Sequence, residues 1–229
     1  MQIAIEDRGA FASAIIQLDA GESFVSESGA MYRTSAEVDV DVTTRSKGKG
    51  GLFGGLKRLL GGESFFLSTY HAAGGVAGEV GIAPTLPGDV MQVDMDGSTR
   101  WLCAGGSYLG SGDELTLDTQ FQGLRGMLSG EKMFFVSVEG AGPLLVSAYG
   151  VIREAAIDGE VIVDTGHVVA FEDTLSYEVT KAGGSWLRSF LGGEGLVMKF
   201  RGSGRLLVQS HNSRAFGAKL GAMLPPRQG

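Results

Sequence analysis

The chain has 229 residues, of which 43% are hydrophobic and 20% are charged, a balance that indicates a folded protein rather than a disordered one. Its 38 glycines follow no G-X-Y period, which excludes collagen and indicates many tight turns. The net charge of -7 disfavours nucleic acid as a partner, and the single cysteine excludes an internal disulfide.

The sequence also predicts where the protein works. Glu6 and Asp7 stand where a secretory signal would need a basic and then an apolar run. The longest stretch without Lys, Arg, Asp or Glu, from Ser64 to Gly78, is shorter than the roughly 20 residues of a membrane-spanning helix. We therefore expect a cytoplasmic protein without a spanning helix.

The periodicity along the chain is that of β-strands. Residues 37–42 alternate carboxylates with valines, which predicts a half-buried strand with its valines facing the core. Residues 159–164 and 167–171 are apolar enough to predict more fully buried strands. Residues 213–224 predict one short helix that ends before Pro225. The predicted fold class is all-β.

A motif of the form L-x-G-E followed by an apolar strand occurs three times, beginning at Leu60, Leu128 and Leu191. This predicts a single domain over residues 1–229 that contains three similar repeats of roughly a third of the chain each. Their approximate bounds are 15–85, 86–150 and 151–211, with a C-terminal tail over 212–229. We expect the repeats to form a β-sandwich or barrel-like assembly around a pseudo-threefold axis, because closure leaves few unpaired edges.

Each L-x-G-E motif is preceded by a segment of large apolar residues with one or two cations among glycines or serines. We name these three segments the interaction rim: Leu52, Phe53, Leu56, Lys57, Arg58, Leu124, Arg125, Met127, Trp186, Leu187, Arg188 and Phe190. One hypothesis is that the interaction rim is the working surface, since apolar and cationic side chains together suit a membrane or a protein partner. The alternative is that these segments pack inward over the sheet ends.

The glutamates of the repeated motif, Glu63, Glu131 and Glu194, could form an acidic ring around the axis. A turn in which each carboxylate accepts backbone N–H groups is the interpretation we favour.

The candidates for chemistry have structural alternatives that we prefer. His167 follows Asp164 closely enough to suggest an acid–base pair, but a histidine bound to a backbone carbonyl is the favoured interpretation. Cys103 lies in an apolar strand, which predicts a buried, inert thiol. Residues 94–97 resemble part of a calcium loop but predict a hairpin turn. Gly50–Lys57 lacks the Gly-Lys-Ser/Thr ending of a phosphate-binding loop.

Four segments carry a resemblance to a known family. They are PGDVMQVDMDG (87–97), LDTQ (117–120), VDTGHVVAF (163–171) and GGEGLV (192–197). In these motifs, and from about Ile15 to His211, the chain resembles the mitochondrial biogenesis family, named from altered inheritance of mitochondria. The resemblance implies a β-sandwich like that of the tryptophan RNA-binding attenuation protein, a trimer and, for mitochondrial members, a role in inner-membrane organisation. It supplies no catalytic residues.

Together these observations predict a non-enzymatic protein without a cofactor or metal. We expect a homo-oligomer, as a trimer, that acts as a scaffold or membrane-associated organiser and does not bind nucleic acid. The alternative is a small-ligand-binding module that uses an end of the sandwich near Asp94, Asp96 and His167.

Overall fold

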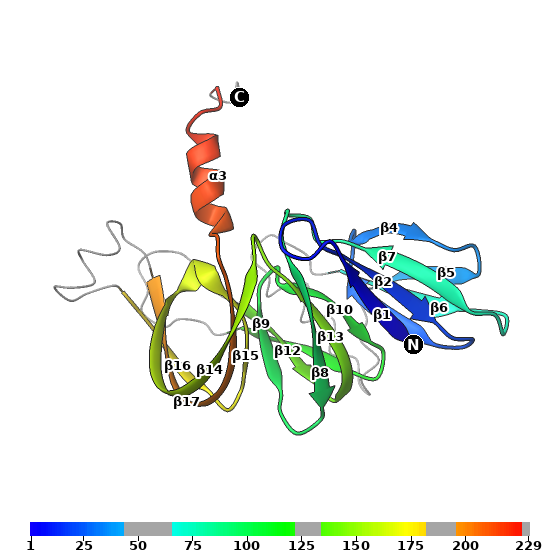
Figure 1. The fold of residues 1–229 in the computed structure, drawn as a ribbon, viewed down its shortest axis with the longest axis horizontal. Helices are drawn as coiled ribbons and strands as arrows, with labels where there is room; N and C mark the ends of the chain where they lie inside the picture. The colour runs from blue at the N-terminus through cyan, green and yellow to red at the C-terminus, as the bar shows by residue number, and fades with distance from the viewer. Residues whose placement is uncertain (44–65, 122–133, 182–195, 226–229) are drawn as a thin grey trace.

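The computed structural model describes residues 1–43, 66–121, 134–181 and 196–225. It confirms the all-β prediction: the chain folds into three antiparallel sheets, and α3 (Ser213–Gly221) is the one α-helix among these residues (Figure 1). The predicted helix over 213–224 is therefore confirmed from Ser213 to Gly221.

The strands of each sheet follow in spatial order. The four-stranded sheet consists of β1 (Gln2–Glu6), β2 (Ser13–Leu18), β7 (Gly78–Ile82) and β4 (Met31–Thr34). The six-stranded sheet consists of β5 (Val38–Thr43), β6 (Leu67–Ala72), β3 (Ser23–Glu27), β10 (Tyr108–Gly112), β13 (Ala141–Ser147) and β8 (Val90–Asp96). The seven-stranded sheet consists of β11 (Thr116–Phe121), β12 (Phe134–Glu139), β9 (Trp101–Ala104), β15 (Val168–Glu172), β17 (Leu196–Gln209) and β14 (Ile152–Asp164), with β16 (Ser176–Lys181) also paired to β17.

The six-stranded sheet lies between two hydrophobic cores, because successive side chains of a strand point to opposite faces. In β10, Leu109 packs in a core with residues of the four-stranded sheet, whereas Tyr108 packs in a core with residues of the seven-stranded sheet. In β13, Leu145 packs in the same core as Leu109, and Leu144 packs in the same core as Tyr108. The middle sheet therefore holds the molecule together through both of its faces.

The seven-stranded sheet curls around a third core (Figure 1). Phe171 lies within it, with ring centroids 5.4 Å from Phe135, 5.2 Å from Tyr177 and 5.0 Å from Phe200, all in edge-to-face arrangements. Such aromatic contacts stabilise a core beyond the area that they bury.

The edge of this sheet contradicts one sequence prediction. β14 pairs along its whole length with β17, from Ile152 with Gln209 to Asp164 with Val197, and with no other strand among the described residues. Residues 159–164, predicted to form a more fully buried strand, are exposed or half-buried because they lie on this edge strand. The buried strand predicted over 167–171 is confirmed from Val168 to Phe171.

The alternating strand predicted over residues 37–42 exists as β5, but its valines differ in burial. Val38 is buried, whereas Val40 and Val42 are exposed. The prediction that all three face the core is therefore wrong for the second half of the strand. β5 is the edge of its sheet, so described strands flank it on one side only.

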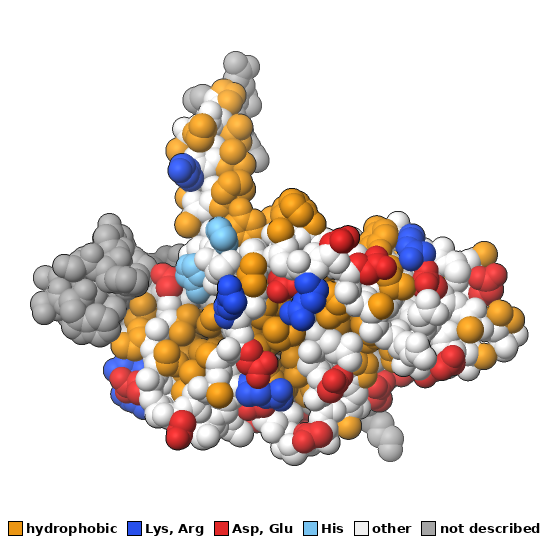
Figure 2. Space-filling model, in the orientation of Figure 1, with side chains coloured by type: hydrophobic (Ala, Val, Ile, Leu, Met, Phe, Trp, Pro, Cys, Tyr) orange, Lys and Arg blue, Asp and Glu red, His pale blue; other side chains and the backbone are white. Residues whose placement is uncertain are grey.

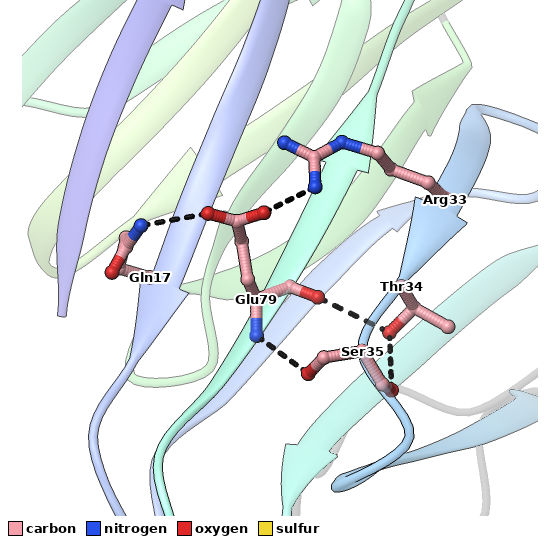
Figure 3. Close-up of polar contacts among 5 residues, drawn as sticks. All are labelled: Gln17, Arg33, Thr34, Ser35 and Glu79. Atoms are coloured by element: carbon pink, nitrogen blue, oxygen red, sulfur yellow. Dashed lines mark hydrogen bonds and ion pairs between the residues drawn. The ribbon is translucent and has the colours of Figure 1, made fainter.

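The four-stranded sheet carries a polar network on its outer face (Figure 3). The Glu79 carboxylate accepts a hydrogen bond of 2.7 Å from Gln17 Nε2 and pairs with the Arg33 guanidinium. The Glu79 backbone N–H donates to Ser35 Oγ at 3.0 Å, and its carbonyl accepts from Thr34 Oγ1 at 3.3 Å. Exposed ion pairs of this kind contribute little to stability, because water competes for both charged groups.

A buried carboxylate joins three distant parts of the chain. Asp89 accepts hydrogen bonds from the backbone N–H groups of Gly9 at 3.0 Å, Val90 at 3.0 Å and Ile152 at 3.3 Å. Its neighbour Gly88 lies so close to β13 that an added Cβ would stand 1.7 Å from the Ala148 carbonyl oxygen. Only glycine fits at position 88, and the carboxylate at position 89 is needed as an acceptor for the three N–H groups.

Three antiparallel hairpins have connections outside the described residues: β5 with β6, β11 with β12, and β16 with β17. The interaction rim and Glu63, Glu131 and Glu194 fall within these connections, so all of them lie outside the part of the chain that the structure describes. The internal threefold repeat remains a prediction.

Candidate functional site

The C-terminal helix α3 begins and ends where the local sequence dictates. Asn212 caps its N-terminus, where Oδ1 accepts hydrogen bonds from Arg214 N at 3.0 Å and Ala215 N at 3.1 Å. Beyond the helix, Pro225 has no N–H with which to continue it. The cap and Pro225 therefore set the two ends of the helix.

α3 projects from the sheets, and none of its residues is buried (Figures 1 and 2). Four large apolar residues recur at i, i+4, i+7 and i+8 along α3 and the turn after it, which places them on one face. We name them the α3 stripe: Phe216, Leu220, Met223 and Leu224, with exposed fractions of 51%, 46%, 76% and 62%. Within the described chain, no helix is both long enough and apolar enough to span a membrane.

Aromatic contacts hold the foot of α3 against the body. The Tyr149 ring, just after β13, lies 5.7 Å from the Phe216 ring and 5.8 Å from the His211 ring, centroid to centroid. His211 Nδ1 lies 2.7 Å from Ser210 Oγ, and this hydroxyl accepts a hydrogen bond of 3.0 Å from Val151 N. The first turn of α3 is thus anchored, whereas Leu220, Met223 and Leu224 stand in solvent.

A groove of about 430 Å³ lies beside this foot. Its walls come from the β7–β8 connection, the β9–β10 turn, the end of β13 and the start of α3; they include Pro84, Leu86, Ser107, Tyr149 and Ser213. The volume falls within the range of small-molecule sites, which is about 300–1,000 Å³. The lining combines hydroxyl groups and apolar side chains with Glu27 and Gln209.

His167 does not form the acid–base pair that the spacing suggested. Asp164 caps a 3₁₀ turn (Thr165–His167), where its Oδ1 accepts a hydrogen bond of 2.8 Å from Gly166 N. His167 Nδ1 lies 2.8 Å from the Gln209 carbonyl oxygen. The favoured prediction of a histidine bound to a backbone carbonyl is therefore confirmed.

Cys103 is fully buried in β9, as predicted. Burial raises the pKa of its thiol to about 12, which leaves almost no nucleophilic thiolate at neutral pH. Nearby in the same core, burial also raises the pKa of Tyr108.

Asp94 and Asp96 do not lie in the predicted hairpin turn: they belong to β8, which pairs with β13, and the turn toward β9 begins only at Gly97. Asp96 Oδ1 accepts hydrogen bonds from Ser98 N at 2.8 Å and Ser98 Oγ at 2.6 Å, which lower the pKa of Asp96. Gly97 takes a φ of 83°, which glycine favours. The proposed grouping of Asp94 and Asp96 with His167 is not formed: the two aspartates lie at the end of β8 beside Ala141 and Pro143, whereas His167 contacts Gln209 next to the foot of α3.

In the ranges that the structure describes, no group of three or more His, Cys, Asp or Glu side chains is placed to hold a metal ion. The strongest functional feature is instead the α3 stripe, which lies on the short helix that the sequence predicted without a function. The i, i+4, i+7, i+8 spacing was the available signal. The exposure of this face could not be predicted from the sequence, because burial depends on what packs against the helix.

Comparisons with known proteins agree with this architecture. The family model "Mitochondrial biogenesis AIM24" matches residues 3–211. An uncharacterised protein of Streptococcus pyogenes serotype M6 is 28% identical over 231 residues, which cover 98% of this chain and 92% of that protein. The crystal structure of SPYM3_0169 from Streptococcus pyogenes is similar with a TM-score of 0.78 and 28% identity, covering 97% of this chain and 99% of that one. The chain therefore belongs to the mitochondrial biogenesis AIM24 family.

Proposed function

We propose that the protein is a non-enzymatic scaffold that attaches to an anionic membrane surface through α3. The observation that carries this proposal is the α3 stripe, a face of large apolar side chains on a helix with no buried residue. A helix of nine residues is only marginally stable in water, so a surface that buries the stripe would also order the helix. Amphipathic helices bind membrane interfaces by burying such a face.

Charge favours a lipid surface as the occupant. From Asn212 to Gly229 the sequence contains Arg214, Lys219 and Arg227 and no acidic residue, although the whole chain carries a net charge of -7. Each cation close to an anionic leaflet contributes about 1 kcal/mol to binding. The tail is therefore a cationic segment of this acidic protein, and its charge matches anionic headgroups.

The projection of α3 separates the tail from the acidic body. A helix of nine residues is about 14 Å long, whereas the Debye length at physiological ionic strength is about 8 Å. Salt therefore screens most of the repulsion between an anionic surface that α3 contacts and the distant acidic groups of the sheets.

The test is flotation with phosphatidylcholine vesicles with and without phosphatidylserine. Wild type should float with the anionic vesicles and be released by high salt, because screening weakens the attraction. The double variant Leu220→Ser/Leu224→Ser should bind at least about tenfold more weakly, since burying one such side chain contributes about 1.5–3 kcal/mol. Lys219→Glu should bind severalfold more weakly than wild type at low salt. This difference should shrink as salt is raised, because salt screens the charge that the substitution changes.

The matched control is Ala218→Ser, which lies on the opposite side of α3 from the stripe. It should bind as wild type does. Equal flotation of the control and the double variant, or no flotation of wild type, would overturn the proposal.

We further propose that the protein works in the cytoplasm as a homo-oligomer, as a trimer, built from three internal repeats. The three hairpins with connections outside the described residues support the repeats, since each encloses one copy of the L-x-G-E motif. The edge strand β14 supports association, because unpaired strand edges favour pairing with another chain. Native mass spectrometry tests this: three chain masses are expected, and a monomer at micromolar concentration would contradict it.

A second candidate function, binding of a small molecule, is favoured by the groove beside α3. Its volume and its mixture of Ser107 and Ser147 hydroxyls with the Leu86 and Tyr149 side chains suit a small amphipathic compound. The same mass spectrum would reveal a reproducible additional mass, which Ser107→Leu should remove by filling the groove.

A further inference from the structure

Two apolar side chains stand at the tips of turns on the same end of the molecule as α3. Phe11, between β1 and β2, is 76% exposed, and Leu86, between β7 and β8, is 44% exposed. Figure 1 shows that both connections lie at the end from which α3 projects. Figure 2 shows apolar side chains on this end beside the helix.

Hydrogen bonds fix these two turns to each other. Ala12 N donates to the Gly88 carbonyl at 2.8 Å, and Gly9 N donates to the Asp89 carboxylate at 3.0 Å. The Leu86 turn also forms a wall of the groove that reaches Ser213 at the start of α3. The two tips and the foot of α3 therefore belong to one continuous surface.

We infer that Phe11 and Leu86 insert into the bilayer as a second contact beside α3, so that this end of the molecule faces the membrane. This inference rests on the proposed function and deepens it, because it assigns an orientation to the bound protein. With α3 alone the body could rotate about the foot of the helix, whereas a second contact fixes the sheets relative to the surface.

The form of the tips favours lipid over a folded protein partner. Each presents one large apolar side chain on a turn, and fluid acyl chains can surround such a side chain without a complementary pocket. Asp7 and Arg8 beside Phe11 carry opposite charges, and Arg8 Nε lies 3.7 Å from the buried Asp89 carboxylate. The tips therefore contribute apolar side chains but no net positive charge. The helix α3 contributes apolar side chains and positive charge.

This division of roles gives the first test. The double variant Phe11→Ser/Leu86→Ser should bind phosphatidylserine-containing vesicles at least about tenfold more weakly than wild type. Because the tips bring no net positive charge, the ratio of the two affinities should stay the same as salt is raised. For Lys219→Glu the corresponding ratio should shrink, since salt screens the contact that it removes. A tip variant that binds as wild type does would overturn the inference.

The second test measures insertion directly. Cys103 is fully buried, so a polarity-sensitive fluorescent maleimide will react selectively with a cysteine introduced at Phe11→Cys or Leu86→Cys. The matched control is Val76→Cys, on the exposed turn between β6 and β7, which Figure 1 places away from α3. On vesicle binding, the dye at positions 11 and 86 should become brighter and shift to shorter wavelength, while the dye at position 76 should not change.

The outcomes separate this inference from the proposed function. If the labelled proteins float with vesicles and the dye at positions 11 and 86 behaves like the dye at position 76, the second contact is wrong and attachment through α3 stands. If no protein floats, the proposed function fails as well. A change in the dye without vesicles that grows with protein concentration would instead assign this end of the molecule to contacts between copies of the chain.

Discussion

At the scale of single residues, Asp89 shows how a short motif can fix long-range structure. Its carboxylate is almost fully buried and accepts N–H groups from the β1–β2 turn, from its own strand and from the start of β14. In the sequence, the segment that contains it carries only a family resemblance. The partners could not be predicted, because Gly9 and Ile152 are distant from Asp89 along the chain.

Asp89→Ala should lower the free energy of unfolding by about 2–4 kcal/mol, because three N–H groups, two of them in buried contacts, would lose their acceptor. Asp89→Asn should lower it less, since the amide oxygen can still accept. The measurement is urea unfolding followed by circular dichroism. Asp94→Ala, which removes an exposed carboxylate bonded to Gln92, serves as the control and should change stability by less than about 0.5 kcal/mol.

Cys103 makes stability depend on alkaline pH. The unfolded thiol ionises near its ordinary pKa of about 8.5, whereas the folded thiol keeps its proton up to a pKa of about 12. The contribution of this group is thus complete below pH 8.5 and is lost as the pH rises, by at most about 1.4 kcal/mol per pH unit. In Cys103→Ala this loss is absent, so the difference in free energy of unfolding between wild type and the variant should fall from pH 8.5 upward. A difference that is constant between pH 8 and 11 would contradict the assignment.

At the scale of elements, the local sequence predicted features that depend on neighbouring residues, such as the position of a helix. The helix α3 could be placed because Pro225 ends it, whereas the hairpin turn predicted at 94–97 was wrong because Asp94 and Asp96 pair with β13 as part of β8. Burial was harder to predict. The apolar residues of β14 suggested a core strand, but the strand order leaves β14 on an edge, and strand order is set by partners far along the chain.

Removing residues 213–229 should leave the urea midpoint unchanged within error, because α3 buries no residue against the sheets. Amide hydrogens of α3 in the intact protein should exchange with solvent much faster than those of β10, which is buried along its whole length. A fall in the midpoint on truncation would show that the contact between Tyr149 and Phe216 supports the body.

At the scale of the whole molecule, the all-β class followed from period-two alternation and abundant glycine, whereas the three-sheet arrangement did not. Antiparallel neighbours such as β3 with β10 and β9 with β15 come from distant parts of the sequence. Such pairings depend on which faces fit together, and no short window of sequence contains that information. The interaction rim and its glutamates lie outside the described residues, so the prediction for them stands as made.

The sheet order has a consequence for synthesis on the ribosome. β3 requires β10 as its neighbour, and Gly110 follows Ser26 by roughly 80 residues. At translation rates of about 5–20 residues per second, one edge of β3 waits several seconds for its partner. The curled sheet cannot close until β17, near the end of the chain, has left the ribosome. The nascent protein therefore exposes strand edges throughout most of its synthesis, and we expect its folding yield to depend on chaperones that shield such edges.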